Sequence, residues 1–300
     1  MKSCRLFSWL PSSVPEFLYT VVLKPKPLRS LANALIKTLI PRQIEVQGIR
    51  LLLNQEDPVV SGALSLGCYE QFDLQVFAGL LKPGMCVLDV GANIGLYSAV
   101  AARQVTNAGL VVAVEPEPRN CQLIEETKKL NGFENITVVR KALADSTGPG
   151  RLFLCKDNQG DHRIYDNTKT RPALTIACTT LDDLCEELGL HHVDVLKMDI
   201  QGAEGKALKG MPATLGNNPD IRVMMELWPW GLAQAGENAL AVLKEIRRLG
   251  FEVFRIDRGN RKIRRVTDDG ELVPDGSAAF RYNVNLLLQR DKKVPGQLES

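Results

Sequence analysis

The sequence predicts an α/β protein built on a doubly wound, mostly parallel sheet with an antiparallel pair of strands at its C-terminal edge. From about residue 67 onward, apolar strand-like runs alternate with helical segments. This alternation is typical of a parallel sheet covered by helices on both faces. The last two runs, 251–256 and 280–288, are separated by a polar segment with no room for a full crossover helix. They are therefore expected to pair antiparallel.

Composition narrows the classes of protein that fit. The chain has 300 residues, with 37 Lys and Arg against 35 Asp and Glu. Such a balance gives no electrostatic reason to expect nucleic acid as a partner. Its three histidines are too few to favour a multi-histidine metal centre. The seven cysteines include no Cys-x-x-Cys pair, which predicts reduced thiols and a cytoplasmic protein.

Residues 1–66 predict an N-terminal extension with one helix near 28–40 and short strands near 43–53. Pro11 and Pro15 interrupt the first apolar run, so no signal peptide is expected. No later run reaches the ~20 apolar residues of a membrane span. Basic residues flank the predicted helix and leave two alternatives open, weak association with a membrane surface or packing on the main domain.

Residues 67–290 predict the main domain, and 291–300 a tail. The stretch 151–178 interrupts the alternation of strands and helices and predicts a lid-like insert with short strands at 151–155 and 174–178. The other elements are expected in this order: helix 69–81, strand 86–90, helix 94–103, strand 110–115, helix 118–130, strand 136–140, helix 181–188, strand 193–198, helix 204–215, strand 221–227 and helix 236–249.

A glycine-containing turn follows the first strand of this domain. Gly91 permits a sharp turn and Gly95 allows close packing of the next helix, so backbone N–H groups can approach a ligand. Asp89 and Asn93 add polar groups suited to the ammonium and carboxylate of an amino acid. These four residues are expected to bind a cofactor.

Two carboxylates follow the next two strands. Glu115, with Pro116 after it, is placed to accept hydrogen bonds from a ribose diol. Asp145 is placed to accept one from an adenine amino group. Together with the glycine turn they predict an adenosine site. S-adenosylmethionine fits better than NAD, because Asn93 occupies the middle glycine of the dinucleotide pattern. An NAD-dependent oxidoreductase remains the alternative.

Five motifs occur in order along the chain: Tyr69-Glu70, residues 87–95 (VLDVGANIG), Glu115-Pro116, residues 180–184 (TLDDL) and residues 197–204 (KMDIQGAE). Together they resemble the FkbM family of S-adenosylmethionine-dependent methyltransferases. The resemblance covers about residues 67–256 and implies a class I methyltransferase-like, Rossmann-type fold with S-adenosyl-L-methionine as cofactor. It implies methylation of hydroxyl groups, often on sugars, glycolipids, polysaccharides or natural products.

Two consequences follow from this resemblance. Glu70 joins the expected cofactor-binding residues. Gln201 departs from the pattern, because the family usually has Glu before the glycine of its Lys-x-Asp-x-Glu-Gly-x-Glu motif. This departure leaves open a second alternative, a catalytically silent protein that binds an adenosine cofactor.

The candidate catalytic residues follow the fourth and fifth strands. A sugar hydroxyl has a high pKa, so its methylation needs a base or a metal. Asp199 is expected as the base or as a substrate-orienting carboxylate, with Glu226 next. His162 in the insert is a further candidate base. No metal is predicted, although Asp199, Glu204 and Glu226 offer oxygen ligands suited to Mg²⁺ or Ca²⁺ as an alternative.

The most concrete hypothesis is an S-adenosylmethionine-dependent O-methyltransferase. Its expected partner is a small-molecule or glycan acceptor, with the hydroxyl on a sugar-containing, lipid-linked or natural-product molecule. The sequence alone does not distinguish among these acceptors.

Overall fold

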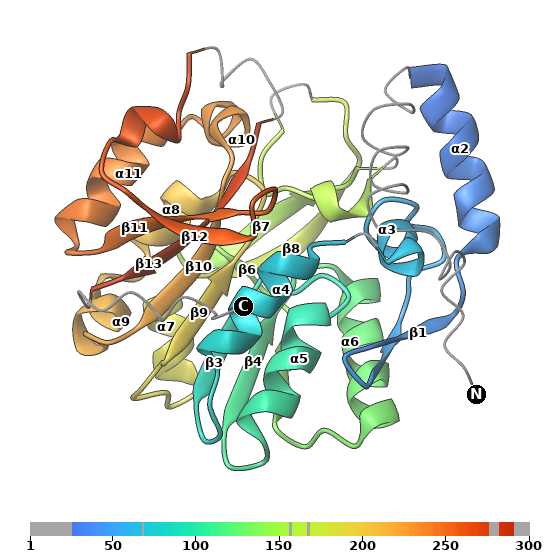
Figure 1. Cartoon of the computed structure of the whole chain (residues 1–300), viewed down its shortest axis with the longest axis horizontal. Coiled ribbons are helices and arrows are strands. Elements are labelled where there is room, and N and C mark those ends of the chain that lie inside the picture. The colour runs from blue at the N-terminus through green and yellow to red at the C-terminus, as the bar shows by residue number, and fades with distance from the viewer. Residues whose placement is uncertain (1–25, 68, 156–157, 167–168, 276–281, 291–300) are drawn as a thin grey trace.

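The computed structural model describes residues 26–67, 69–155, 158–166, 169–275 and 282–290, with side chains described from residue 33 onward. The predicted tail 291–300 and residues 1–25 lie outside the described residues. The described part has an eight-stranded sheet flanked by helices and two smaller sheets (Figure 1).

The main sheet confirms the predicted doubly wound, mostly parallel arrangement. Five neighbouring strands of this sheet run parallel: β5, β4, β3, β9 and β10. The strand β13 is antiparallel to both of its neighbours, β10 and β11. From one edge to the other the strands are β12 (Lys262–Val266), β11 (Glu252–Asp257), β13 (Val284–Gln289), β10 (Arg222–Leu227), β9 (Val195–Met198), β3 (Cys86–Val90), β4 (Leu110–Val114) and β5 (Ile136–Val139).

The C-terminal strands differ from the prediction in one respect. The expected antiparallel pair forms between β11 and β13, but the polar segment between them also forms a strand, β12, which is the edge of the sheet. The buried apolar run of β13 suits the interior position between β10 and β11. The basic side chains of β12 suit an edge, where charge discourages pairing with other chains.

The two faces of the sheet carry two hydrophobic cores, because successive side chains of a strand point to opposite faces. Val87 and Val195 belong to one core, and Leu88 and Leu196 to the other. Full burial of each such side chain contributes roughly 1.5–3 kcal/mol. The first core includes residues of α4 (Gln71–Leu80), α5 (Leu96–Val105) and α6 (Pro118–Asn131); the second includes residues of α7 (Leu181–Glu187), α8 (Glu204–Lys209), α10 (Pro229–Gln234) and α11 (Ala239–Arg248).

The helix expected at 204–215 is instead two helices. α8 ends before Gly210, and α9 (Pro212–Asn217) begins with a proline. Proline is well tolerated in the first turn of a helix but not within one. The short helix α10, directly after β10, was not predicted either.

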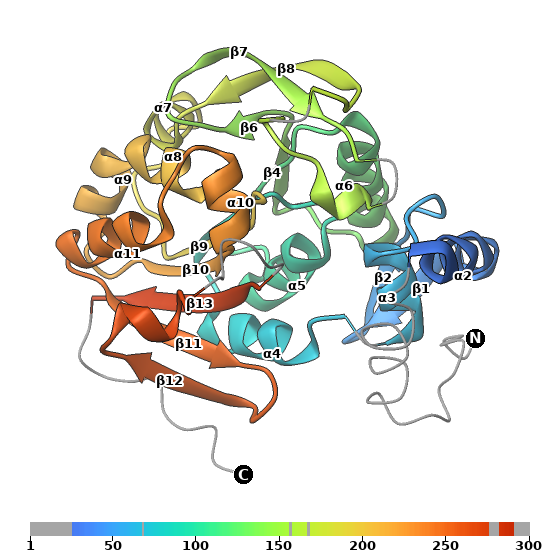
Figure 2. The ribbon, with the colours of Figure 1, turned by 90° about the horizontal axis from the view of Figure 1, so that it is seen from above.

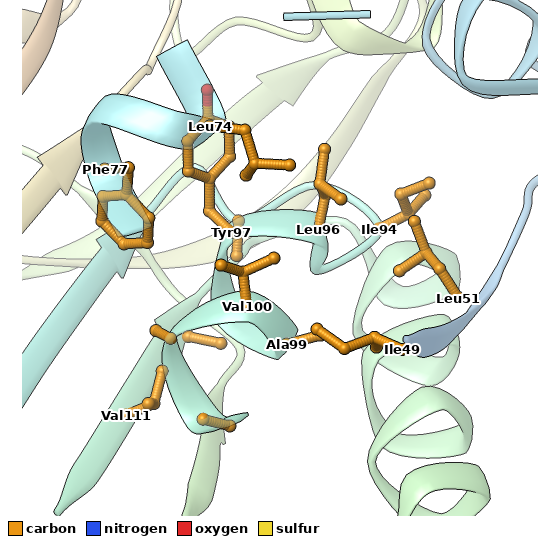
Figure 3. Packing of buried hydrophobic residues seen from close by; sticks show 14 of the residues in the cluster. Ile49, Leu51, Leu74, Phe77, Ile94, Leu96, Tyr97, Ala99, Val100 and Val111 are labelled. Carbon is orange, nitrogen blue, oxygen red and sulfur yellow. The ribbon is translucent and has the colours of Figure 1, made fainter. Parts of the chain in front are cut away.

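The N-terminal elements pack on the first core. The described part of this segment contains one helix, α2 (Lys26–Leu39), and two short strands, β1 (Gln43–Val46) and β2 (Ile49–Leu52), close to the positions expected, and an additional helix, α3 (Val60–Leu66). Ile49 and Leu51 of β2 are buried near Ile94, Leu96 and Ala99 (Figure 3). This segment therefore contributes to the same hydrophobic core as the parallel strands.

α2 lies at the periphery of the molecule (Figures 1 and 2). Leu35 and Leu39 are 63% and 45% exposed. Among the described helices, none is long and apolar enough to cross a membrane. Association of this segment with a membrane surface stays a prediction.

The predicted insert, 151–178, is part of a three-stranded sheet of β6 (Ala142–Leu143), β8 (Ala173–Thr179) and β7 (Gly148–Phe153), which therefore begins before residue 151. A 3-10 turn, η2 (Gln159–Asp161), lies between β7 and β8. Arg163 fixes the insert to the rest of the chain. Its guanidinium pairs with Asp161 at 2.5 Å and lies 4.8 and 5.0 Å from the ring centroids of Trp228 and Trp230. The tryptophan pair after β10 is therefore engaged in packing this arginine.

Candidate functional site

A cavity of about 260 Å³ lies at the carboxyl edge of the parallel strands. Its walls include the loops after β3, β4 and β9, Glu226 near the end of β10, the insert, and Val59 and Val60 of the N-terminal segment. Asp89, Gly95 and Asp145 are absent from its lining. The predicted site residues that do line it are Glu70, Gly91, Asn93, Glu115, Pro116, His162, Asp199 and Glu226.

The strand order arranges the polar groups along this edge. Glu115 follows β4, Gly91 follows β3, Asp199 follows β9, Glu226 lies near the end of β10, and Asn283 precedes β13. Neighbouring strands lie about 4.8 Å apart, so roughly 14 Å separate the β4 and β10 positions. The cavity therefore has two ends.

We define these ends by the residues that line them. The β4 end is lined by Glu115, Pro116, Asn120, Ala142 and Leu143. The acidic end is lined by Glu70, Lys197, Asp199, Gln201, Glu226 and Asn283.

At the β4 end, backbone donors fix the carboxylate of Glu115. One of its oxygens accepts the Asn93 N–H at 2.8 Å and the other accepts the Glu117 N–H at 2.9 Å. Burial raises the pKa of Glu115 to about 7. The side chain is only 6% exposed but lines the cavity. A fixed, buried carboxylate of this kind is suited to accept hydrogen bonds from two neighbouring hydroxyls.

The turn after β3 lies between the two ends. Gly91 has a φ of +75°, and a Cβ on it would lie 1.9 Å from the carbonyl oxygen of Asp199. Only glycine therefore allows the loops after β3 and β9 to approach this closely. Asn93 also adopts a positive φ, 51°, and its side-chain oxygen accepts the Ile94 N–H at 2.8 Å.

At the acidic end, an amide bridges two carboxylates. The Nε2 atom of Gln201 donates to Asp199 Oδ1 at 2.6 Å and to Glu226 Oε2 at 3.2 Å. Asn283 donates to the other oxygen of Glu226 at 2.5 Å. Burial, and next the charge of Asp199, raise the pKa of Glu226 well above its usual value. This environment favours the protonated form of Glu226.

Glu70 is held in the same end by two donors. The hydroxyl of Tyr97 donates to it at 2.8 Å, and Arg258 donates to its other oxygen at 2.8 Å. Arg258 also pairs with the buried Asp73 at 2.5 Å. Glu70 has a φ of 42°, an uncommon conformation for a residue with a side chain. Three of the positive-φ non-glycine residues, Glu70, Asn93 and Gln201, line this cavity.

Asp89 lies beneath the cavity instead of facing it, which corrects the expectation of direct contact with a cofactor. Its side chain points to the α5 face of the sheet, where it accepts a hydrogen bond from the Ser98 hydroxyl at 2.6 Å. Lys197, its neighbour in register on β9, has Nζ 3.8 Å from Asp89 and 3.9 Å from Asp199. Asp89 is therefore placed to hold Lys197, which does line the cavity.

Two other expected cofactor contacts are not at the cavity. A Cβ on Gly95 would lie 2.9 Å from Ile124, so this glycine allows α5 to pack on α6. Asp145 is exposed. It follows β6, which pairs with β8 and carries the chain away from the cavity toward the insert sheet.

His162 lines the cavity, but its hydrogen bond does not suit a general base. Its Nδ1 accepts the backbone N–H of Cys155 at 3.1 Å, so the neutral ring carries its proton on Nε2. Burial lowers the pKa of His162, which favours this neutral form. The ring therefore offers a hydrogen-bond donor at Nε2.

Glu204 has a structural role in the loop after β9. It is fully buried, one of its oxygens accepts the Ile200 N–H at 3.1 Å, and burial raises its pKa to about 7. Within the described part of the chain, no group of three or more His, Cys, Asp and Glu side chains is placed to hold a metal ion. The alternative metal site of Asp199, Glu204 and Glu226 is not formed.

Several residues of this site were not predicted from the sequence. Tyr97 and Arg258 hold Glu70, Asn283 holds Glu226, and Val59 and Val60 contribute to the wall. They come from segments far apart in the sequence and carry no motif of their own. Among the residues of the site that were not predicted, only Gln201 had been singled out in the sequence, because it departs from the family pattern.

The cavity fits S-adenosylmethionine on two observations. The fixed Glu115 carboxylate suits a ribose diol at the β4 end. At and beneath the acidic end, carboxylates outnumber cations, which suits a positively charged sulfonium. These groups are the carboxylates Glu70, Asp73, Asp89 and Asp199 and the cations Lys197 and Arg258.

The fold and this site define a class I methyltransferase-like protein. Residues 89–253 match the model of the methyltransferase FkbM domain. The chain belongs to the FkbM methyltransferase family, and its cofactor is S-adenosylmethionine. This membership speaks against the NAD-dependent alternative.

Individual relatives match over part of their length. The 2-O-methyltransferase NoeI of Sinorhizobium fredii is 27% identical over 158 residues, which cover 47% of this chain and 63% of NoeI. The AMB antimetabolite synthetase AmbE of Pseudomonas aeruginosa is 31% identical over 212 residues, 58% of this chain and 10% of AmbE. The chain thus matches less than two thirds of either relative. A solved FkbM methyltransferase from Methylobacillus flagellatus KT superposes with a TM-score of 0.42 at 15% identity, covering 88% of this chain and 60% of that one.

Proposed function

We propose that this protein transfers a methyl group from S-adenosylmethionine to a hydroxyl oxygen of a sugar-containing, lipid-linked or natural-product acceptor. One observation carries the proposal: a single cavity extends from the fixed carboxylate of Glu115 to the pair Asp199 and Glu226. The name of the relative NoeI, a 2-O-methyltransferase, supports oxygen as the acceptor atom.

In this proposal the β4 end holds the nucleoside. Glu115 would accept hydrogen bonds from the ribose hydroxyls, and Pro116 and Leu143 would contact the base. The turn from Gly91 to Asn93 would hold the amino-acid portion, and Glu70 would accept from its ammonium. The expectation that Asp145 binds the adenine amino group does not fit the exposed position of this residue.

At the acidic end Asp199 acts as the base. When bound, the cofactor supplies an electrophilic methyl group. Asp199 accepts the proton of the acceptor hydroxyl, and the Gln201 amide holds its carboxylate in place. The ammonium of Lys197 lies 3.9 Å from the same carboxylate.

Glu226 orients the acceptor. Its raised pKa favours a protonated carboxyl, which can donate a hydrogen bond to an acceptor oxygen. Apolar side chains of the insert and the N-terminal segment, among them Leu152, Ile164 and Val60, line the cavity and reduce its access to water.

The test combines cofactor binding with methyl transfer. Calorimetry with S-adenosylhomocysteine measures binding, and tritiated S-adenosylmethionine follows transfer to a panel of glycans, glycolipids and hydroxylated natural products. Transfer to oxygen that is lost in Asp199→Asn would support the proposal. Transfer to nitrogen would refute oxygen as the acceptor atom. Tight cofactor binding without transfer to any panel member would favour the catalytically silent alternative.

A further inference from the structure

Gln201 lies between two carboxylates, at a position where the FkbM family usually has the charged residue Glu. Asp199 and Glu226 come from the ends of adjacent strands, β9 and β10. Two neighbouring carboxylates in a buried site repel each other unless a cation, a proton or a hydrogen-bond donor lies between them. Here the Nε2 group of Gln201 donates to both, at 2.6 and 3.2 Å. The amide satisfies the pair without adding a charge.

The backbone around Gln201 is built to hold this amide in place. Gln201 has a φ of 55°, a conformation that costs free energy for a residue with a side chain. Its carbonyl oxygen accepts the hydroxyl of Tyr165, from the insert, at 2.6 Å. A Cβ on the next residue, Gly202, would lie 2.5 Å from the Tyr165 hydroxyl and from the Gly231 backbone. The turn therefore lies closely between Tyr165 and the Gly231 backbone, and Gln201 lines the cavity.

We infer that Gln201 is a positioning residue that holds Asp199 and Glu226 together without a bound metal ion, beside the ammonium of Lys197, and that a carboxylate at position 201 would turn this end of the cavity into a divalent-cation site. Three carboxylates in this arrangement would supply oxygen ligands with a net negative charge, which Ca²⁺ and Mn²⁺ prefer. With glutamine, the amide nitrogen occupies the position between the two carboxylates where such a cation would bind. Within the proposed function, the acidic end would therefore receive a neutral hydroxyl without a metal ion beside it. This last step rests on the proposed function, whereas the behaviour toward cations does not.

The experiment compares cation binding by the full chain and its variants in calorimetric titrations with CaCl₂ and with MnCl₂. The variant is Gln201→Glu. Its matched control is Gln47→Glu, which introduces the same charge at another residue with a positive φ, 50°, on the exposed turn between β1 and β2. Each sample is also titrated with S-adenosylhomocysteine, which tests the proposed cofactor site separately.

We expect Gln201→Glu to bind Ca²⁺ or Mn²⁺ about tenfold or more tightly than wild type, because the number of charged ligands sets the affinity of such sites. Gln47→Glu should behave as wild type. Adding Asp199→Asn to Gln201→Glu should abolish the gain. Equal cation affinity in folded Gln201→Glu and Gln47→Glu would overturn the inference.

The wild-type protein gives a second test that requires no variant at position 201. It should show no cation binding that depends on Asp199. Binding that is present in wild type and lost in Asp199→Asn would show that the pair already accepts a cation, and the inference would be wrong.

Discussion

The carboxylates at the two ends of the cavity are held by different kinds of hydrogen-bond donor. At the β4 end, Glu115 is held by backbone N–H groups of the two loops beside it. At the acidic end, Asp199, Glu226 and Glu70 are held by side chains, the amides of Gln201 and Asn283 and the guanidinium of Arg258. The first end depends on how the loops turn, and the second on which side chains distant segments supply.

This difference suggests how the two ends tolerate change. A backbone donor is retained whatever side chain its residue carries, so the β4 end can be kept while the rest of the cavity varies. A side-chain donor is lost by a single substitution. Within the proposed function, substitutions at Gln201, Glu226 or Asn283 are therefore expected to alter the choice of acceptor, whereas Glu70 at the same end is assigned to the cofactor.

The largest effect is expected for a substitution at the acidic end, Asp199→Asn, which should change turnover but not cofactor binding. Asp199→Asn should lower the turnover number by about 10²–10⁴, because it removes the proposed general base. Its affinity for S-adenosylhomocysteine should stay within a few-fold of wild type, since Glu115 is untouched. Turnover is measured with tritiated S-adenosylmethionine and an acceptor identified from the panel. Unchanged turnover would remove Asp199 from the mechanism.

The converse substitution is Glu115→Ala. It should weaken S-adenosylhomocysteine binding by about 10–100-fold, because hydrogen bonds to a charged group contribute about 1.5–3 kcal/mol. Calorimetry measures the affinity, and circular dichroism checks the fold. Affinity equal to that of wild type would place the ribose elsewhere.

The pKa of Glu115 predicts a pH dependence of cofactor binding. With a pKa of about 7 in the free chain, this carboxyl is mostly protonated at pH 6 and mostly ionised at pH 8. The ionised form accepts from both ribose hydroxyls, so affinity should fall about tenfold from pH 8 to pH 6. Burial also raises the pKa of Glu70 and of Glu226, which line the acidic end, whereas Glu204, with a pKa of about 7, does not line the cavity. Glu115→Gln should flatten the profile, and a slope that survives in this variant would assign the titration to Glu70 or Glu226.

The smallest effect is expected at Asp145. Because this side chain is exposed and lies outside the cavity, Asp145→Ala should leave S-adenosylhomocysteine affinity within about twofold, the range of ordinary surface substitutions. A loss approaching that of Glu115→Ala would restore Asp145 to the adenine site and show that the insert rearranges on binding.

The same contrast explains what the sequence could predict. The β4 end follows from local signals: a glycine turn after one strand and an acidic residue after the next, on strands whose apolar runs define a parallel sheet. The predicted sheet, its order of helices and strands and the lining positions of Gly91, Asn93 and Glu115 follow from these signals. Asp89 and Gly95 belong to the same motif, but side-chain alternation and helix packing direct them away from the cavity.

The acidic end could be predicted only in part. Asp199 directly follows β9 and Glu226 lies near the end of β10, and both line the cavity, as these local signals lead one to expect. Asn283 and Arg258 could not be assigned to the site from the sequence, because only the position of β13 between β10 and β11 brings these C-terminal residues to the same edge. The role of His162 depends on a single hydrogen bond to Cys155, which no sequence pattern encodes.

A crystal structure of the protein with S-adenosylhomocysteine tests the central claim most directly. The account predicts both ribose hydroxyls within about 2.5–3.2 Å of the Glu115 carboxylate. It also predicts that the sulfur lies on the Asp199 side of the Gly91 turn, toward the Gln201 amide. A nucleoside bound at the acidic end, or a sulfur directed away from Asp199, would contradict it.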